Sequence, residues 1–471
     1  MSSFLNYCYY WSTSEEQSIL NIMKRYFYIL LSFLLGLGFY GLDSHFLWTH
    51  QGQQSIVLSI LICAMTLWIT EVIPLFVTAI MSSFFLIIFT NFTPRAIFAP
   101  YFDPVIILFL GGFLLARAIQ KHQMDFISAQ YILSKVSNKP SYFLLALMFF
   151  TAFLSLWVSN TASAAIMIPL AIIILKENNL IQIHVKSRFA TTMILGVAYA
   201  ATIGGVGSLV GSPPNAIAVS YLEKQGIALS FLDWMIKTIP FLVLALIFIW
   251  QTLLWINPPE IKKIAFSKKY IAINKNHKLT LLIFLITVVG WLTTSLSGLS
   301  SSTVALVPII LLFIFQVLDE ADLSKISWST ILLFGGGLSL GNALTQAGIG
   351  EWIVIWVQQY LVNTPQFITI FGFVISSILL TMTVSNTAAA AILIPLILPL
   401  AKPLGFSPTL AATLIAVGVS LDFMIPIGTP PSAIAHSTGL VKVSEMVKNG
   451  VLINIGTALI LSTLFYFVYA F

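Results

Sequence analysis

The chain has 471 residues, of which 58% are hydrophobic and only 8% are charged, and its formal net charge at pH 7 is +6. A soluble protein of this length would form two or more domains with charged surfaces, and this composition excludes such surfaces. We therefore expect an all-α integral membrane protein. The basic excess is interpreted as a signal for membrane orientation rather than for nucleic-acid binding.

Apolar stretches of spanning length, roughly 17–25 residues each, recur along the chain. A cytoplasmic N-terminal tail is predicted at 1–25, and a basic cytoplasmic loop at 257–277 separates two transmembrane halves, 26–256 and 278–471. With this orientation, 18 Lys and Arg residues fall on the cytoplasmic side and four on the other, as the positive-inside rule requires. About eleven transmembrane helices are expected, at 26–48, 54–70, 72–90, 104–120, 188–210, 235–256, 278–297, 303–318, 328–344, 408–427 and 447–470.

Two further apolar segments, 141–175 and 365–401, are each interrupted by the tetrapeptide Ser-Asn-Thr-Ala. The sequences from Ser159 (SNTASAAIMIPLAI) and from Ser385 (SNTAAAAILIPLIL) match at 10 of 14 positions. Each arm has only about 15–18 residues, which is short for a full crossing at 1.5 Å per residue. Each segment is therefore expected to form a re-entrant hairpin with its tip near the membrane midplane. An odd number of spans separates the copies, so we predict inverted-topology repeats.

A second paired motif interrupts the fifth and tenth spans, as GSPPNAIA at 211–218 and GTPPSAIA at 428–435. Consecutive prolines remove amide donors and block helix continuation, so both spans are expected to be broken helices. Non-helical backbone at membrane depth is tolerated only where it is buried in protein or lines a cavity. The two tips and the two breaks are therefore expected to converge, which is typical of a transporter.

The residues at these discontinuities suit an anion and an alkali cation. The helix that follows each tip presents free backbone N–H groups and a partial positive charge. Hydroxyl, amide and unwound carbonyl oxygens are hard ligands for a cation, and Ser155 and Thr381, one turn before each tip, are candidate ligands. An enzyme would need a nucleophile with a base or a metal cluster, and the six histidines are scattered. A channel would carry rings of charge or a repeated filter without inverted hairpins.

Several residues in or beside the motifs have simpler structural explanations. The Ser-Asn-Thr copies could act only as helix caps, although two copies paired with two breaks favour a binding site. Pro169 and Pro395 are interpreted as helix kinks, and Glu71 as a residue that fixes the turn between the second and third spans. Asp422 is explained equally well by a structural hydrogen bond and by function. His436 is better explained as a packed or solvent-facing histidine than as a titrating one.

The chain resembles the divalent anion/sodium symporters, a family that carries dicarboxylates, citrate or sulfate. The resemblance rests on the Thr-Glu-x-x-Pro segment at 70–74, both Ser-Asn-Thr tips and both Gly-x-Pro-Pro breaks, and it extends over nearly the whole chain. It implies a homodimeric secondary transporter, in a bacterial inner (plasma) membrane, that couples sodium to C4-type dicarboxylates such as succinate, malate or fumarate. It also implies elevator-type alternating access. Sulfate or another divalent anion, and sodium-independent dicarboxylate exchange, are the alternatives.

The resemblance also implies sites for substrate and for co-transported sodium ions. The first sodium site would comprise Ser155, Ser159, Asn160 and Gly211. The second would comprise Thr381, the carbonyl group of Val384, Asn386 and Gly428. Substrate carboxylates would contact Asn160, Thr161, Ser212, Asn386, Thr387, Thr429 and Pro430.

Three positions bear on how closely the chain follows the family. Ser432 stands where an asparagine is expected in the second break, and His436 where a hydrophobic or aromatic residue is commoner. Ser163 stands where sodium-independent exchangers tend to carry an arginine just after the first Ser-Asn-Thr-Ala. Without that fixed cation, sodium is the natural counter-charge for a dianion, so symport is favoured over exchange.

Overall fold

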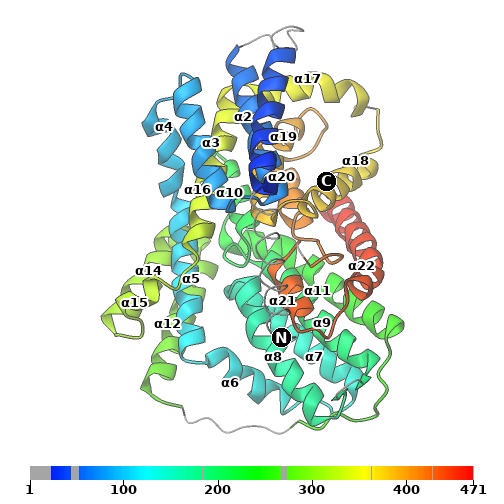
Figure 1. Ribbon diagram of the computed structural model, residues 1–471. Coiled ribbons are helices and arrows are strands. Elements are labelled where there is room, and N and C mark those ends of the chain that lie inside the picture. Colours follow the sequence, from blue (N-terminus) through cyan, green and yellow to red (C-terminus); the bar gives the residue numbers. More distant parts are fainter. Residues whose placement is uncertain are drawn as a thin grey trace, which may run out of the picture.

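The computed structural model describes residues 23–43, 52–182, 185–266, 273–361, 363–426 and 428–469, which are almost entirely helical where they are regular (Figure 1). One antiparallel pair of two-residue strands, β1 (Ile181–Gln182) and β2 (Val185–Lys186), is the exception among them. The predicted helical class is confirmed. Most of the predicted N-terminal tail and residues 267–272 of the predicted basic loop lie outside the described residues.

Among the described residues, nine helical segments are long and apolar enough to cross a membrane, and five apolar helices are shorter. The nine are Met23–Asp43, Gly52–Thr70 (α2), Pro94–Lys121 (α4, η1 and α5), Pro140–Trp157 (α7), Asn160–Glu177 (α8), Arg188–Gly207 (α9 and η2), Phe231–Ile256 (α11), Lys275–Leu292 (α12) and Val443–Val468 (within α22 and η4). The shorter ones are Leu75–Phe89 (α3), Ser301–Ile314 (α14), Gln366–Thr381 (α18), Asn386–Leu400 (α19 and η3) and Pro408–Gly418 (α20).

Several of these segments are subdivided, and further helices join them. The bounds are Pro94–Phe98 (α4), Ala99–Phe102 (η1), Pro104–Lys121 (α5), Met124–Leu133 (α6), Arg188–Gly204 (α9), Gly205–Gly207 (η2), Pro213–Lys224 (α10), Thr294–Ser297 (α13), Glu320–Leu323 (α15), Trp328–Gln346 (α16), Ile349–Leu361 (α17), Asn386–Ile397 (α19), Leu398–Leu400 (η3), Pro430–Ser437 (α21), Val443–Leu464 (α22) and Phe465–Tyr469 (η4).

The prediction of about eleven spans is correct in part. Three of the expected spans are short helices, and the expected span 328–344 lies in α16, which has 19 residues but is not among the nine segments. Helix α3 has 15 residues, α14 has 14 and α20 has 11. Helix α20 begins after the capping residue Ser407 and ends at Gly418, where the second break starts, so the predicted span 408–427 is helical only in its first half. The hairpin arms α7 and α8, at 18 residues each, instead reach spanning length.

The helices pack as two groups (Figure 1). One group contains α3, α5, α12, α14 and α16, and the other contains α7 to α11 and α18 to α22. Helix α16 contacts α3 in its own group and α19 in the other. Its Gly337 allows this approach, because a Cβ there would lie 2.8 Å from the Cβ of Ala391. In the first half, a Cβ on Gly111 of α5 would lie 2.5 Å from the carbonyl oxygen of Ala305 in α14. The sequence has two glycine clusters, Gly111-Gly112 and Gly335-Gly336-Gly337, and both therefore mark close helix contacts.

Each half of the chain sends one short helix into the other half. Helix α10, which follows the first break, packs on α19 and α20, whereas α21, which follows the second break, packs on α8 and α9. The two hairpins also lie at opposite ends of the molecule, with α7 and α8 in the lower part of Figure 1 and α18 and α19 in the upper part. Helices α6 and α17, which follow α5 and α16, form a further matched pair that the sequence analysis did not predict.

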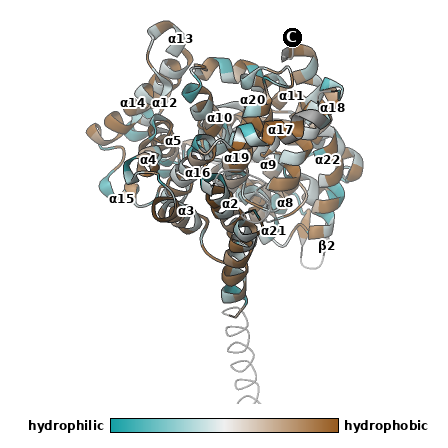
Figure 2. Ribbon diagram, turned by 90° about the horizontal axis from the view of Figure 1, so that it is seen from above, coloured by the Kyte–Doolittle hydropathy of each residue, from teal (hydrophilic) through white to brown (hydrophobic). Residues whose placement is uncertain are grey.

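Hydrophobic residues cover the outward surface of the molecule, whereas the segment that leads into the first break is buried. The peripheral helices carry mainly hydrophobic residues (Figure 2), and Phe84, Phe89, Leu282 and Ile310 are each more than half exposed. Exposed apolar surface of this extent fits contact with lipid. In contrast, the most apolar 18-residue stretch of the Arg188–Gly207 segment is completely buried within the protein. The first break thus begins at the end of a helix that protein surrounds.

Candidate functional site

The two hairpin tips have the same local structure. Ser159 is the N-cap of α8 and accepts a hydrogen bond from the backbone N–H of Ala162 at 3.4 Å, and Ser385 caps α19 through the N–H of Ala388 at 3.3 Å. The serine hydroxyl of each motif therefore caps the first turn of the helix that follows it. The first N–H groups of a helix have no intrahelical partner, so those of the following Asn and Thr remain open to an anion.

A cluster of oxygen atoms surrounds the Asn160 side chain at the first tip. The hydroxyl of Ser155, one turn earlier in α7, lies 2.8 Å from the Asn160 carboxamide and donates to the carbonyl oxygen of Ala201 at 2.6 Å. With its nitrogen turned toward these oxygens, the carboxamide donates to the carbonyl groups of Gly211 at 3.1 Å and Ala201 at 3.3 Å. Three oxygen atoms, the Ser155 hydroxyl and the carbonyl oxygens of Ala201 and Gly211, thus meet around the end of the Asn160 side chain, as hard ligands of a cation do.

The second tip repeats this arrangement. The Thr381 hydroxyl donates to Oδ1 of Asn386 at 2.9 Å, which reproduces the Ser155–Asn160 pair with a threonine in place of the serine. Thr381 is fully buried, and Val384, which lies between the two in sequence, is 3% exposed. The hydroxyl and the amide oxygen are therefore held together inside the protein.

The backbone of the first break is held by side chains within the first half. The amide nitrogen of Asn215 donates to the carbonyl oxygens of Gly205 at 2.9 Å and Ser208 at 2.7 Å. The indole nitrogen of Trp234 donates to the carbonyl oxygen of Val206 at 3.0 Å. The asparagine of the GSPPN motif is thus a clamp on the unwound segment that precedes it.

The second break is held differently, because its motif carries Ser432 in place of that asparagine. The hydroxyl of Ser432 only accepts a hydrogen bond from Thr429, at 2.9 Å. The preceding backbone is instead anchored at Phe423, whose N–H donates to Asn454 Oδ1 at 3.2 Å and whose carbonyl accepts from the hydroxyl of Tyr199 at 2.7 Å. Tyr199 belongs to α9 and Asn454 to α22, so both halves hold the second break.

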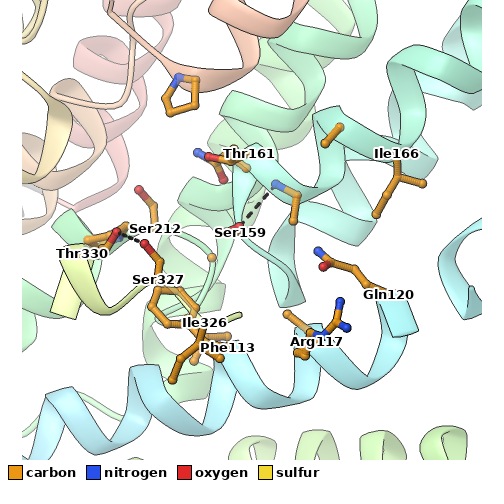
Figure 3. A pocket seen from close by; sticks show the side chains of 18 of the residues that line it. Phe113, Arg117, Gln120, Ser159, Thr161, Ile166, Ser212, Ile326, Ser327 and Thr330 are labelled. Atoms are coloured by element: carbon orange, nitrogen blue, oxygen red, sulfur yellow. Dashed lines mark hydrogen bonds between the residues drawn. The ribbon is translucent and has the colours of Figure 1, made fainter. Parts of the chain in front are cut away.

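One cavity of about 1100 Å³ connects both tips and both breaks. Most of the predicted site residues line it, and Thr161, Ser159 and Ser212 are visible in its wall in Figure 3. Thr429, Ser155, Thr381 and Val384 are not in the lining and are buried behind it. The predicted residues in the lining are Ser159, Asn160, Thr161, Gly211, Ser212, Asn386, Thr387, Gly428 and Pro430.

Arg117 and Lys325 bring positive charge to this cavity, and the sequence analysis missed both. Arg117 and Gln120 extend from α5 on the side of the cavity opposite Ser159 and Thr161 (Figure 3). Arg117 lies one helical turn before the end of α5. It belongs to none of the sequence motifs, so the sequence alone does not distinguish it from other basic residues at the ends of spans. The four binding motifs contain no Lys or Arg, yet the folded cavity has both on its wall.

Asp322 organises these charges. Its carboxylate accepts from Arg117 Nε at 2.9 Å and from Lys121 Nζ at 2.6 Å, and Lys325 Nζ lies 3.9 Å away. Burial by itself raises the pKa of Asp322, but hydrogen bonds from Lys121, from the Asp319 backbone and from Arg117 outweigh burial and lower that pKa to about 2. Asp322 is therefore ionised at neutral pH, and it fixes the position of the Arg117 side chain.

Two acidic residues also line the cavity. Asp125, in α6, is 4% exposed, and burial raises its pKa to about 6 despite a hydrogen bond from the Phe126 backbone at 2.7 Å. Glu71 has a left-handed backbone conformation (φ 48°) in the turn between α2 and α3. It lies in the turn for which the sequence analysis expected a structural role, and it also faces the cavity.

Of the remaining residues singled out from the sequence, Pro169 lines the cavity, whereas His436, Asp422, Pro395 and Ser163 are not in its lining. His436 Nδ1 lies 2.9 Å from the carbonyl oxygen of Val441, and Asp422 is completely buried. Pro169 and Pro395 lie inside α8 and α19, which continue through them. Ser163 is fully buried, and its hydroxyl has no partner among the described residues. Within those same residues, no group of three or more His, Cys, Asp or Glu side chains could hold a metal ion.

Comparisons with known proteins give one family model, several relatives and a solved structure of the same fold. Residues 65–391 and residues 298–471 match the profile of the family described as citrate transporter, CitMHS. An uncharacterized transporter of Haemophilus influenzae is 32% identical over 87% of this chain and 90% of its own length. The sodium-dependent dicarboxylate transporter SdcS of Staphylococcus aureus strain USA300 is 30% identical over 88% of this chain and 85% of its own. The crystal structure of the Alcanivorax borkumensis YdaH transporter shares the fold, with a TM-score of 0.56 at 14% identity over 79% of this chain and 86% of that one.

Proposed function

The chain belongs to the citrate transporter family and is a membrane transporter rather than an enzyme, and from this premise we propose that it is a sodium-coupled symporter of C4-type dicarboxylates. The family resemblance expected from the sequence is confirmed. The observation that carries the proposal is the single cavity where both hairpin tips and both helix breaks meet. Succinate, malate and fumarate are the proposed substrates, and sodium is the proposed co-substrate. Relatives named sodium-dependent dicarboxylate transporters support this assignment.

Two equivalent anion positions favour a dicarboxylate over a single compact anion. The N-termini of α8 and α19 both open into the cavity, one from each half of the chain. Each would bind one carboxylate through free backbone N–H groups and the side chains of its Asn and Thr. Ser212, Thr429 and Pro430 would complete the substrate site from the two breaks. Arg117 and Lys325, farther along the wall, would attract the dianion into the cavity.

Sodium would bind in the oxygen clusters behind the tips. In the first, the oxygen atoms of Ser155 and Gly211 already lie around the end of the Asn160 side chain, and the Asn160 carboxamide would rotate to bring its own oxygen to the ion. Ser159 would complete this site. In the second, Thr381 and Asn386 form the matching pair, to which the Val384 carbonyl and Gly428 would add ligands. Because Asn160 and Asn386 would contact both ion and substrate, filling one site would prepare the other, which is the physical basis of coupling.

The transport movement would follow from the arrangement of the two helix groups. We assign the halves 26–256 and 278–471 as inverted-topology repeats with re-entrant hairpins at 141–175 and 365–401, separated by a cytoplasmic loop at 257–277. The group that contains both hairpins and both breaks would move as the transport domain against the group of α3, α5, α12, α14 and α16. A homodimer in a bacterial plasma membrane, with its N-terminus in the cytoplasm, would hold the second group fixed.

The proposal is tested by uptake of labelled succinate into proteoliposomes with an inward sodium gradient. We expect accumulation that requires external sodium and is competed by malate and fumarate. Undiminished accumulation with choline in place of sodium, driven only by internal dicarboxylate, would identify an exchanger and overturn sodium coupling. Inhibition by sulfate that exceeds inhibition by malate would instead assign the site to a smaller divalent anion.

A further inference from the structure

The two helix breaks differ in charge at one matched position. Gly205 stands six residues before Gly211 in the first break, and Asp422 stands six residues before Gly428 in the second. At Gly205, a Cβ would lie 1.9 Å from the end of the Asn160 carboxamide, so only glycine leaves room for this hairpin side chain. In the second break the matched residue contributes a carboxylate, and this carboxylate lies over Gly428. A Cβ on Gly428 would be 1.3 Å from Asp422 Oδ2.

The Asp422 carboxylate is buried, and its hydrogen-bond donors are backbone N–H groups. Its exposed fraction is zero, its Oδ1 accepts from the N–H of Met424 at 3.3 Å, and the N–H of Ile425 also donates to the carboxylate. Its Oδ2 is buried and has no hydrogen-bond partner in the part of the chain that the structure describes. An ionised carboxylate inside a protein is strongly unfavourable unless a counter-charge accompanies it. The unpartnered oxygen therefore points to a positive ligand.

A structural role does not account for this residue. The backbone of the second break is already anchored at Phe423, through Asn454 on one side and Tyr199 on the other. The backbone hydrogen bonds that Asp422 accepts, from Met424 and Ile425, could also be accepted by the neutral side chain of an asparagine or a serine. The fold thus does not explain why residue 422 carries a negative charge. The Asp422 carboxylate lies against Gly428, which is a sodium ligand in the proposed function.

We propose that Asp422 is an anionic ligand of the second sodium ion, an inference that rests on the sodium coupling proposed above. A single carboxylate among neutral oxygens suits a monovalent cation, and the described residues offer no cluster of three acidic or histidine ligands for a divalent metal. The first site would hold its ion with neutral oxygens alone. The two sodium sites are therefore unequal, and the second binds its ion more tightly.

Thermal unfolding of the purified protein tests this inference without transport. Sodium is titrated against choline at constant ionic strength, for the wild type and for Asp422→Asn, which keeps the shape and the hydrogen bond to Met424. We expect sodium to raise the wild-type midpoint. In Asp422→Asn, the sodium concentration for half of the rise should increase by about tenfold or more, as for loss of one charged contact. Without sodium, the variant should be at least as stable as the wild type, because an uncompensated buried charge is removed.

The outcomes separate this inference from the proposed function. A wild type that responds to sodium together with an Asp422→Asn variant of unchanged half-point overturns the role of Asp422 and leaves sodium coupling intact. A wild type whose midpoint ignores sodium overturns both. Asp422→Ser, which approaches the small residue of the first break, supplies the measurement if asparagine does not fold. The matched control is Asp233→Asn, which removes one exposed carboxylate at the start of α11 and should leave the half-point unchanged.

Discussion

At the scale of single residues, two asparagines are central to the proposed site, and the sequence reveals them more readily than it reveals their charged neighbours in the cavity. The repeated Ser-Asn-Thr-Ala identifies Asn160 and Asn386, because each occurs in a polar tetrapeptide within an apolar segment. Arg117 and Asp125 carry no such signal. They reach the same cavity from α5 and α6 only through tertiary packing, and one sequence does not specify which charged residue at the end of a span faces inward.

Replacing either asparagine with alanine should stop transport without unfolding the protein. Asn160→Ala and Asn386→Ala each remove a group proposed to contact sodium and substrate together, so uptake should fall to background. Stability should fall by about 1 kcal/mol for each hydrogen bond removed, so the loss should be larger for Asn160→Ala than for Asn386→Ala. Reconstituted uptake and thermal unfolding measure the two effects. Asn178→Ala, at the opposite end of α8, is the control and should transport normally; uptake at wild-type rates by either tip variant would remove the asparagines from the mechanism.

Asp125 should make the protein less stable at neutral pH than at mildly acidic pH. Its pKa is raised to about 6 in the folded protein, so the folded state binds more protons than the unfolded state between roughly pH 4 and 6. Stability from this group is therefore lost as pH rises through that range. Asp125→Asn should be more stable than the wild type by about 3 kcal/mol at pH 8, with the difference shrinking toward zero at pH 4.

Chemical or thermal unfolding at pH 8, 6 and 4 measures this difference. Glu320→Gln, which changes an exposed carboxylate in α15, should show no comparable trend. A constant difference between wild type and Asp125→Asn across the three pH values would mean that burial of Asp125 does not control its protonation.

At the scale of elements, the sequence predicts where helices break better than how long they are. Consecutive prolines and Ser-Asn-Thr mark all four discontinuities, since both act through local backbone chemistry. The short α20, by contrast, depends on the second break unwinding as far back as Gly418, and its anchors Tyr199 and Asn454 come from distant helices. Helices α6 and α17 were missed because neither is long enough to read as a span.

The glycine clusters should be intolerant of even one methyl group. Gly111→Ala would place Cβ 2.5 Å from the Ala305 carbonyl oxygen and force α5 away from α14, at a cost of about 1–3 kcal/mol. Gly372→Ala, inside α18 with open space around it, should instead gain up to about 1 kcal/mol from helix propensity. The thermal unfolding midpoints of the two variants measure this difference. Equal shifts in the midpoint would show that α5 and α14 can move apart at little energetic cost.

At the scale of the whole molecule, the inverted arrangement has a direct topological test. The α7–α8 hairpin should open to the cytoplasm and the α18–α19 hairpin to the outside, because they approach the centre from opposite ends (Figure 1). Single cysteines at Pro140 and at Thr364, in a background without Cys8 and Cys63, should react with an impermeant reagent from the cytoplasmic and external faces respectively. Labelling of both from the same face would refute inverted repeats.

The exchange of α10 and α21 between the halves also sets the order in which the protein can be completed on the ribosome. Helix α10 ends at Lys224 and its partner α19 begins at Asn386, about 160 residues later. At roughly 5–20 residues per second, synthesis of that interval takes on the order of 8–30 s. During this time the surface of α10 that packs on α19 and α20 has no final neighbour. The nascent first half is therefore an incomplete structure that the membrane insertion machinery must shelter until the second half arrives.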